Sequence, residues 1–235
     1  MISIIIPVLN EEKILREKKR YYQNLSHQAQ LIFVDGGSYD CTVEAASEFG
    51  EVIQARTGRA FQKNVGAKRA SSDYLLFLHV DVLVNPDSFP VMIKALNNGA
   101  VGGCLTMSID DLKPVFRFYE NAVNFRARAF GVIDGDLGLF VRRDVFEQLG
   151  GFDELPVMED LTFARKLKKA GKITVLSSFV SVSSRKWHER GFLETFGLYT
   201  LAFLQLWTKI PFFKHPDDRS KTSETIEHRP YSLRA

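Results

Sequence analysis

Cysteine and strong net charge are both scarce in this sequence of 235 residues. The two cysteines, Cys41 and Cys104, lack C-x-x-C spacing, which favours reduced thiols in a cytoplasmic protein over a disulfide framework. The 31 basic residues are nearly balanced by 28 acidic ones, and the resulting net charge of +3 is too mild for a nucleic-acid groove. We therefore expect a cytoplasmic protein that does not bind nucleic acid.

Several sequence motifs of common enzyme classes are also missing. No G-x-G-x-x-G follows the first apolar segment, and no G-x-x-x-x-G-K-[ST] occurs anywhere. No serine lies in a nucleophile elbow. Dinucleotide binding, P-loop chemistry and serine-triad hydrolysis therefore lose support.

Long apolar runs are lacking too. Residues 195–208 contain no charge, but a membrane-spanning helix needs about 20 apolar residues. A packed terminal helix is the simpler expectation for this segment. The alternative is an interfacial helix giving peripheral contact with the inner face of the membrane, because Trp207 lies near the end of the segment and Phe212 and Lys214 follow it. The N-terminus begins directly in the apolar segment 2–6 without a basic region, unlike a signal peptide.

Apolar segments and helical patterns alternate along the first hundred residues. The pattern predicts strands at 2–6 (ended by Pro7), 31–34, 52–55 and 74–78, with helices following Asn10 and at 41–49 and 61–70. Such alternation is typical of βαβ units, whose parallel strands all end at one side of a sheet. The second half predicts helices at 87–97, 114–129, 160–170 and near 192–208, and strands at 100–107, 137–141, 173–176 and 179–183.

Polar residues follow the predicted strands. His79 and Asp81 come directly after an apolar run, and in an extended segment their side chains would point the same way and reach one cation. Further polar segments at the same edge are 7–11, 35–38 and 58–66. Each segment alone is more typical of a turn or a solvated helix face. Together they predict a nucleotide-binding crevice.

The second half adds candidate groups for chemistry. Glu159 and Asp160 begin a predicted helix, where carboxylates are usually favoured by the helix dipole, but one of them is a candidate general base. Gly135-Asp136 lies in a turn that could bind hydroxyl groups. Residues 185–188 contain cations for phosphate and His188 as a further metal ligand, with a structural Trp187 as the alternative.

These segments together resemble a family-2 glycosyltransferase of GT-A fold, over about residues 1–208. The resemblance is carried by residues 4–12, 34–42, 63–66, 79–81 and 150–153, followed by Glu159-Asp160. It implies an α/β fold with a Rossmann-like nucleotide-binding half and a mixed central sheet with helices on both faces. It further implies one domain over 1–214, with a nucleotide-sugar half (1–107) and an acceptor half (108–214), before a polar tail at 215–235.

The resemblance also implies roles for individual residues. His79-Val80-Asp81 matches the family's D-x-D motif with histidine in place of the first acid, so Asp81 would hold a divalent metal, Mn²⁺ or Mg²⁺, with His79 and His188 as further ligands. Asp160 matches the catalytic base of inverting members, preceded by Glu159. Lys186-Trp187 resembles part of the Q-x-x-R-W motif of processive synthases, but Ser183 replaces its glutamine and no membrane domain is present. The residues expected to bind the donor are Pro7, Leu9, Glu11, Asp35, Arg59, Lys63, His79, Val80, Asp81, Lys186 and Trp187.

A narrower resemblance points to short, soluble bacterial glycosyltransferases associated with radical-SAM genes and arsenosugar biosynthesis. The expected reaction is metal-assisted, inverting transfer from a nucleotide-diphosphate sugar, a UDP-sugar in the first instance, to a small-molecule or glycan hydroxyl. Three alternatives stay open: a retaining transferase on the same fold, a nucleotidyltransferase, and a degenerate nucleotide-sugar-binding protein.

Overall fold

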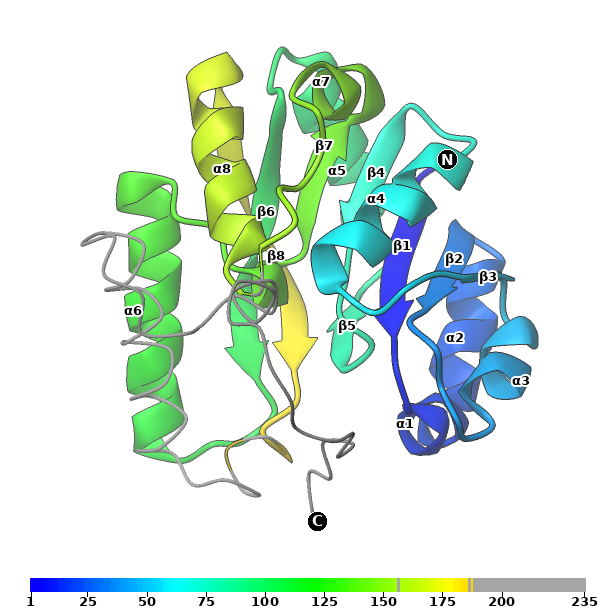
Figure 1. Ribbon diagram of the computed structural model, residues 1–235. Coiled ribbons are helices and arrows are strands. Elements are labelled where there is room, and N and C mark those ends of the chain that lie inside the picture. Colours follow the sequence, from blue (N-terminus) through cyan, green and yellow to red (C-terminus); the bar gives the residue numbers. More distant parts are fainter. Residues whose placement is uncertain (156, 186, 188–235) are drawn as a thin grey trace, which may run out of the picture.

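The chain folds around an eight-stranded mixed sheet, in a computed structural model that describes residues 1–155, 157–185 and 187. The strand order is β3-β2-β1-β4-β7-β6-β8-β5 (Figure 1). The strands are β1 (Ser3–Val8), β2 (Gln30–Asp35), β3 (Glu51–Gln54), β4 (Tyr74–Phe77), β5 (Val82–Val84), β6 (Gly102–Ile109), β7 (Leu139–Arg142) and β8 (Ile173–Val182). The strands β3, β2, β1 and β4 run parallel to one another, whereas β7 is antiparallel to both β4 and β6.

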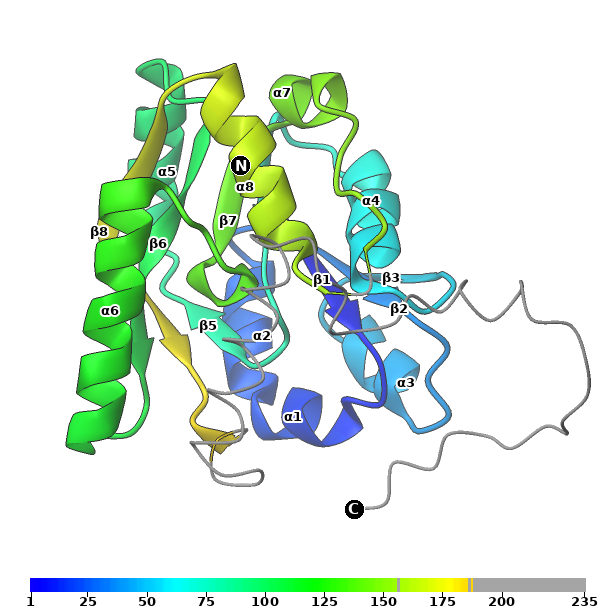
Figure 2. The same cartoon turned by 60° about the vertical axis from the view of Figure 1, so that its left-hand side comes forward.

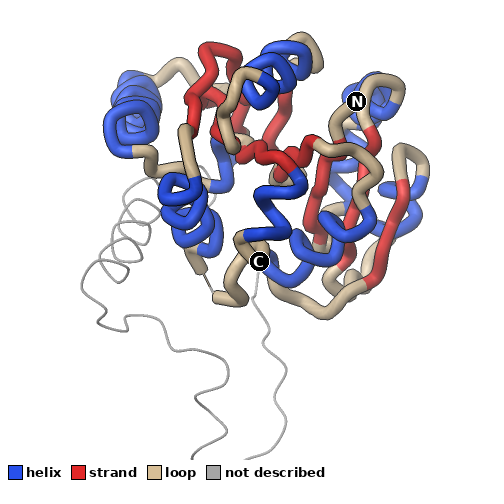
Figure 3. Tube along the Cα trace, turned by 90° about the horizontal axis from the view of Figure 1, so that it is seen from above, coloured by secondary structure: helices blue, strands red, loops and turns tan. Residues whose placement is uncertain are grey.

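Helices lie on both faces of the sheet (Figure 3), as expected. They are α1 (Glu12–Glu17), α2 (Lys19–Ser26), α3 (Thr42–Ser47), α4 (Arg59–Arg69), α5 (Ser88–Asn97), α6 (Pro114–Phe130), α7 (Arg143–Gln148) and α8 (Glu159–Ala170), with a short 3-10 helix η1 (Gly135–Leu137). Tyr22 of α2 packs edge-on against Phe33 of β2, with ring centroids 5.6 Å apart. Gly66 of α4 contacts Val34, the next residue of β2, whose side chain points to the other face. Both faces of β2 are therefore covered, which explains its uninterrupted apolar sequence.

Helix α4 approaches the sheet unusually closely at Gly66. A β-carbon at this position would lie 2.5 Å from Ile5 Cγ2 and 2.9 Å from Val34 Cγ2, so a glycine is required here. The close approach places the first turns of α4 against the carboxyl ends of β1 and β2. Lys63, three residues before Gly66, consequently points into the interior and is buried.

Strand β1 continues through Pro7 to Val8, so the strand end predicted at Pro7 is wrong. The carbonyl of Ile5 accepts a hydrogen bond from Leu78 N at 3.1 Å, on the side of β4. Pro7, two residues later, faces the same side, where β4 has already ended at Phe77. The missing N–H of Pro7 therefore costs the sheet no ladder hydrogen bond.

Two other elements differ from the prediction. The helix following Asn10 is two helices, α1 and α2, and the second extends to Ser26. The two strands predicted at 173–176 and 179–183 are one strand, β8, whose register with β6 shifts between Cys104 and Thr106. A bulge of this kind bends a strand without ending it.

Within the described ranges, no helix has both the length and the apolarity needed to cross a bilayer. The apolar segment 195–208 and the predicted tail 215–235 lie outside the described residues.

Candidate active site

The carboxyl ends of β1 and β2 are joined by the buried side chain of Gln62. Its Nε2 donates to the carbonyl of Val8 at 3.0 Å and to that of Val34 at 2.7 Å. These bonds satisfy two buried carbonyls and fix the first turns of α4 at the edge of the sheet. No local pattern indicates this role, because a glutamine in the first turn of a helix is usually exposed.

Asp35 is buried at the end of β2 and shapes the turn that follows. Its carboxylate accepts hydrogen bonds from the backbone N–H groups of Gly37, at 3.0 Å, and Ser38, at 3.1 Å. The Ser38 hydroxyl in turn accepts a hydrogen bond from Asn10 N at 2.8 Å, which ties this turn to the loop after β1. The Ser38 hydroxyl also donates to Asp35 Oδ1, so most of the roughly four acceptor positions of this carboxylate are used within the turn.

The chain turns sharply after β4, and His79 and Asp81 do not lie in an extended segment as predicted. Val82 N donates to the carbonyl of His79 at 3.1 Å, which closes a turn over residues 79–82 and starts β5. The buried Tyr22 hydroxyl donates to the carbonyl of Val80 at 2.7 Å and holds this turn in place. His79 and Asp81 therefore occupy different positions of a turn instead of one face of a strand.

A buried cluster of charged groups lies beside this turn. Lys63 Nζ contacts Glu159 Oε1 at 2.9 Å and Asp160 Oδ1 at 2.6 Å. The side chains of Lys63, Glu159 and Asp160 are only 1%, 4% and 10% exposed. Lys63 also lies over the ring of Phe152, 5.1 Å from its centroid. The cluster joins α4 to the first turn of α8 across 97 residues of sequence.

The charges in the cluster influence one another strongly. Burial alone would raise the pKa of Glu159, but the Lys63 ammonium outweighs burial and lowers this pKa to about 2. Burial, reinforced by the negative charge of Glu159, raises the pKa of Asp160 above its ordinary value. Burial would lower the pKa of Lys63, but the two carboxylates outweigh it and raise this pKa. Glu159 is thus the fixed anion, and Asp160 is the better proton acceptor.

The position of α8 is fixed by the loop before it. The Asn64 side chain of α4 donates to the carbonyl of Phe152 and accepts from its N–H, each at 2.9 Å. Met158 has a φ of 66°, an uncommon value for a non-glycine residue, and is the N-cap of α8. The first turn of α8 consequently points toward the centre of the sheet and α4 (Figure 2).

His79 faces the cluster from the other side. Its Nδ1 lies 2.9 Å from Asp136 Oδ1 of η1. Its Nε2 is buried and has no hydrogen-bond partner among the described residues. Gly135 lies against both groups, since a β-carbon there would be 2.3 Å from Asp160 Oδ2 and 2.8 Å from His79 Nε2.

These groups fit a divalent cation. One ligand atom from each of His79, Glu159 and Asp160 lies within 4.8 Å of the other two. The Nε2 of His79 is buried without a hydrogen-bond partner among the described residues, and Gly135, which has no side chain, adjoins it. Carboxylates suit ions such as Mn²⁺ and Mg²⁺, and an imidazole beside them suits transition-metal ions. Asp81, half-buried in the turn, is outside this group of three.

The other predicted residues are distributed along the same edge. Arg185 Nη2 lies 3.9 Å from Glu11 Oε2, which brings the end of the described chain to the loop after β1. Trp187 is buried, with its ring 5.7 Å from those of Phe116 and Tyr119 on α6, as the structural alternative for this residue requires. Lys186 and His188 lie outside the described residues. Four further residues occupy the segments in which they were expected: Pro7, Leu9, Arg59 and Val80.

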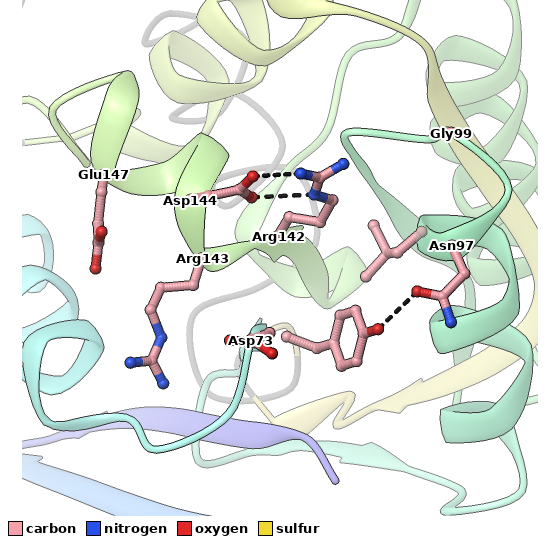
Figure 4. Close-up of a pocket in the computed structure, with 9 residues that line it drawn as sticks. Asp73, Asn97, Gly99, Arg142, Arg143, Asp144 and Glu147 are labelled. Carbon is pink, nitrogen blue, oxygen red and sulfur yellow. Dashed lines mark hydrogen bonds and ion pairs between the residues drawn. The ribbon is translucent and has the colours of Figure 1, made fainter.

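Figure 4 shows a different hollow, at the opposite end of β4. It has a volume of about 580 Å³ and is lined by Asp73, Tyr74, Leu96, Asn97, Gly99, Arg142, Arg143, Asp144 and Glu147. Arg142 and Asp144 pair with each other, and Arg143 donates to the carbonyl of Ser72. None of the predicted site residues lines this hollow.

The chain is similar to curated bacterial glycosyltransferases over part of their length. It is 31% identical to the 4,4'-diaponeurosporenoate glycosyltransferase of Staphylococcus haemolyticus over 130 residues, covering 51% of this chain and 34% of that protein. It is 24% identical to the undecaprenyl-phosphate 4-deoxy-4-formamido-L-arabinose transferase of Pseudomonas fluorescens over 156 residues, covering 60% of this chain and 46% of that protein. The chain thus spans less than half the length of these relatives.

Two solved structures share the fold. S. aureus TarS residues 1–349 in complex with UDP align with a TM-score of 0.62 and 20% identity, covering 80% of this chain and 62% of that one. The mannosyltransferase PcManGT from Pyrobaculum calidifontis, in complex with GDP-Man and Mn²⁺, aligns with a TM-score of 0.59 and 19% identity, covering 77% and 56%. These neighbours confirm the predicted GT-A fold. The model of glycosyl transferase family 2 matches residues 3–192, and the chain belongs to this family.

Proposed function

We propose that this protein transfers a sugar from a nucleotide-diphosphate sugar to an acceptor hydroxyl, with inversion at the anomeric carbon. The proposed donor is a UDP-sugar in the first instance. The observation that carries the proposal is a buried cluster of charged groups, with His79 beside it, at one edge of the sheet. Its members are Lys63, Glu159 and Asp160. In open α/β sheets, ligands bind beyond the carboxyl ends of the strands, where these groups lie. The nucleotide-bound states of TarS and PcManGT support the donor class.

Within this proposal, the two halves of the chain bind different substrates. Residues 1–107 bind the donor, with Asp35 and the loop at 7–11 near the base and ribose. Residues 108–214 bind the acceptor, a small molecule or a glycan. Asp160 takes the proton of the acceptor hydroxyl as its oxygen attacks the anomeric carbon, while Glu159 and Lys63 hold Asp160 in position through the buried ion pairs.

A divalent metal would be held by His79, through Nε2, with Asp81 of the same turn as the further ligand that the D-x-D resemblance implies, while Glu159 and Asp160 keep their ion pairs with Lys63. When bound, it would supply electrostatic stabilisation of the negative charge on the departing nucleoside diphosphate. The structure supports His79, because one of its ring nitrogens lies within 4.8 Å of a carboxylate oxygen of Glu159 and of one of Asp160. The complex of PcManGT with GDP-Man and Mn²⁺ supports the choice of ion.

The proposal is tested by the products formed from a panel of UDP- and GDP-sugars with Mn²⁺ or Mg²⁺. We expect release of nucleoside diphosphate, by transfer to water where no acceptor is supplied, and chromatography separates it from other products. Release of pyrophosphate would instead identify a nucleotidyltransferase, and donor binding without turnover on any acceptor would identify a degenerate binder. With an acceptor in hand, a proton NMR time course of the anomeric signal distinguishes inversion from retention.

Substitution of Gly135 by alanine is expected to lower the rate of nucleoside diphosphate release by about 10²-fold, the effect of misplacing reacting groups by about 1 Å. The new β-carbon would displace Asp160 Oδ2 and His79 Nε2. The φ of Gly135 is not in the left-handed region, so backbone strain contributes little.

Gly99→Ala is the control, because it should show the opposite pattern. Nothing lies within 4 Å of a β-carbon there, but its φ of 90° strains any other residue. We expect a lower melting temperature with an unchanged rate for Gly99→Ala. Equal rates for Gly135→Ala and the parent would show that reacting groups do not meet at Gly135.

A further inference from the structure

We propose that Asp136 is a positioning residue that fixes the tautomer of His79 and thereby makes this metal site prefer Mn²⁺ over Mg²⁺. The inference rests on the proposed function for the presence of a metal. Beyond the D-x-D resemblance, it assigns a role to Asp136, which contacts the metal ligand His79 and not the ion, and it assigns a preference between two ions.

The hydrogen bond between the two side chains determines the tautomer. An ionised carboxylate only accepts hydrogen bonds, so the 2.9 Å contact with Asp136 Oδ1 requires a proton on Nδ1 of His79. In the neutral imidazole, Nε2 then carries the lone pair. This Nε2 is buried, and no donor from the described part of the chain reaches it.

Asp136 is itself held by the fold. It lies in η1, between the ion pair of Asp134 with Arg126 of α6 and the strand β7. Leu137 N donates to the carbonyl of Asp134 at 3.0 Å, which closes the turn around Asp136. The side chains of Asp136 and His79 are each 14% exposed, so water competes little for their hydrogen bond.

The charges beside Nε2 favour a cation. One ammonium group, that of Lys63, faces two carboxyl groups, those of Glu159 and Asp160. A metal-bound histidine commonly donates its second N–H to a carboxylate, and this outer-shell bond orients the ring and increases its basicity. The pair formed by Asp136 and His79 has that arrangement.

The nitrogen ligand influences the choice of ion. Mg²⁺ is a hard ion that demands oxygen ligands, whereas divalent transition metals also accept imidazole nitrogen, with an affinity that rises from Mn²⁺ toward the later ions of the series. A site that uses His79 in place of the first acid of a D-x-D motif should therefore favour Mn²⁺. Asp136 strengthens this preference as long as it holds the lone pair of Nε2 toward the cluster.

The test uses the full chain with Asp136→Ala, His79→Asp and, as a matched control, Asp144→Ala, whose carboxylate pairs with Arg142 in the remote hollow. Mn²⁺ affinity is measured by electron paramagnetic resonance titration with UDP present, and Mg²⁺ affinity by competition. We expect Asp136→Ala to weaken Mn²⁺ binding by about 10- to 100-fold. We expect His79→Asp to reverse the preference toward Mg²⁺, and Asp144→Ala to match the parent.

The tautomer supplies a second readout, which a merely structural role of Asp136 would not change. Nitrogen-15 NMR of the imidazole rings, with His79→Asp assigning the signal, should show Nδ1–H in the parent and a shift toward Nε2–H in Asp136→Ala. An Nε2–H tautomer in the parent, or unchanged Mn²⁺ affinity in Asp136→Ala, overturns the inference. Mn²⁺ binding that depends on Asp136, without turnover of any nucleotide sugar, would retain the inference and refute the proposed function.

Discussion

Asp160→Asn is expected to reduce sugar transfer by about 10²- to 10⁴-fold, the usual cost of removing a general base. Asparagine preserves the shape of the side chain but cannot accept the proton of the acceptor hydroxyl. The ion pair of Lys63 with Glu159 at 2.9 Å remains, so the fold around the cluster should persist. The rate of nucleoside diphosphate release with acceptor present measures the effect.

Donor binding separates a chemical effect from a structural one. We expect Asp160→Asn to bind UDP with the affinity of the parent in calorimetry. Asp153→Asn, the same substitution at an exposed carboxylate that pairs with Lys166, should leave the rate unchanged. Transfer at the parental rate by Asp160→Asn would refute the assignment of Asp160 as the base.

Lys63→Met is expected to lower the free energy of unfolding by about 3–5 kcal/mol, because it leaves two buried carboxyl groups without their cation. Methionine has a similar length and fills the space with apolar atoms. Denaturant unfolding followed by circular dichroism measures the change. Arg69→Met on the same helix breaks a largely exposed pair with Glu51 and should cost less than about 1 kcal/mol.

A double variant tests the electrostatic reason. Adding Glu159→Gln to Lys63→Met removes one of the two uncompensated carboxylates, so part of the lost stability should return. A loss below about 1 kcal/mol for Lys63→Met alone would show that the buried pairs contribute no more than surface pairs do.

Periodicity in the sequence was sufficient for most of the sheet and insufficient at one decisive place. The apolar runs of β1 and β2 predict buried strands because both faces are covered. Residues 78–81, however, contain no glycine or proline, so no strong turn signal shows that the chain leaves the extended conformation at His79 before β5 begins at Val82. The turn depends on tertiary contacts such as the Tyr22 hydroxyl on the Val80 carbonyl.

The candidate site was predictable in its residue types and not in its contacts. Lys63 was expected near the donor, but its partners Glu159 and Asp160 lie 96 and 97 residues away, beyond any local pattern. The sequence predicts that the turn at Asp136 could bind hydroxyl groups, and only the fold shows that this residue lies beside His79. The signal that could have found it is the pairing of a histidine in a D-x-D position with an acid in a glycine-flanked turn.

The separation of Lys63 from its carboxylates also affects biosynthesis. At about 5–20 residues per second, the ribosome adds the 97 residues up to Asp160 in roughly 5–20 s. During this interval the nascent N-terminal half has no internal counter-ion for a lysine that its own packing tends to bury. We therefore expect the N-terminal half to reach its final state only after α8 has left the exit tunnel.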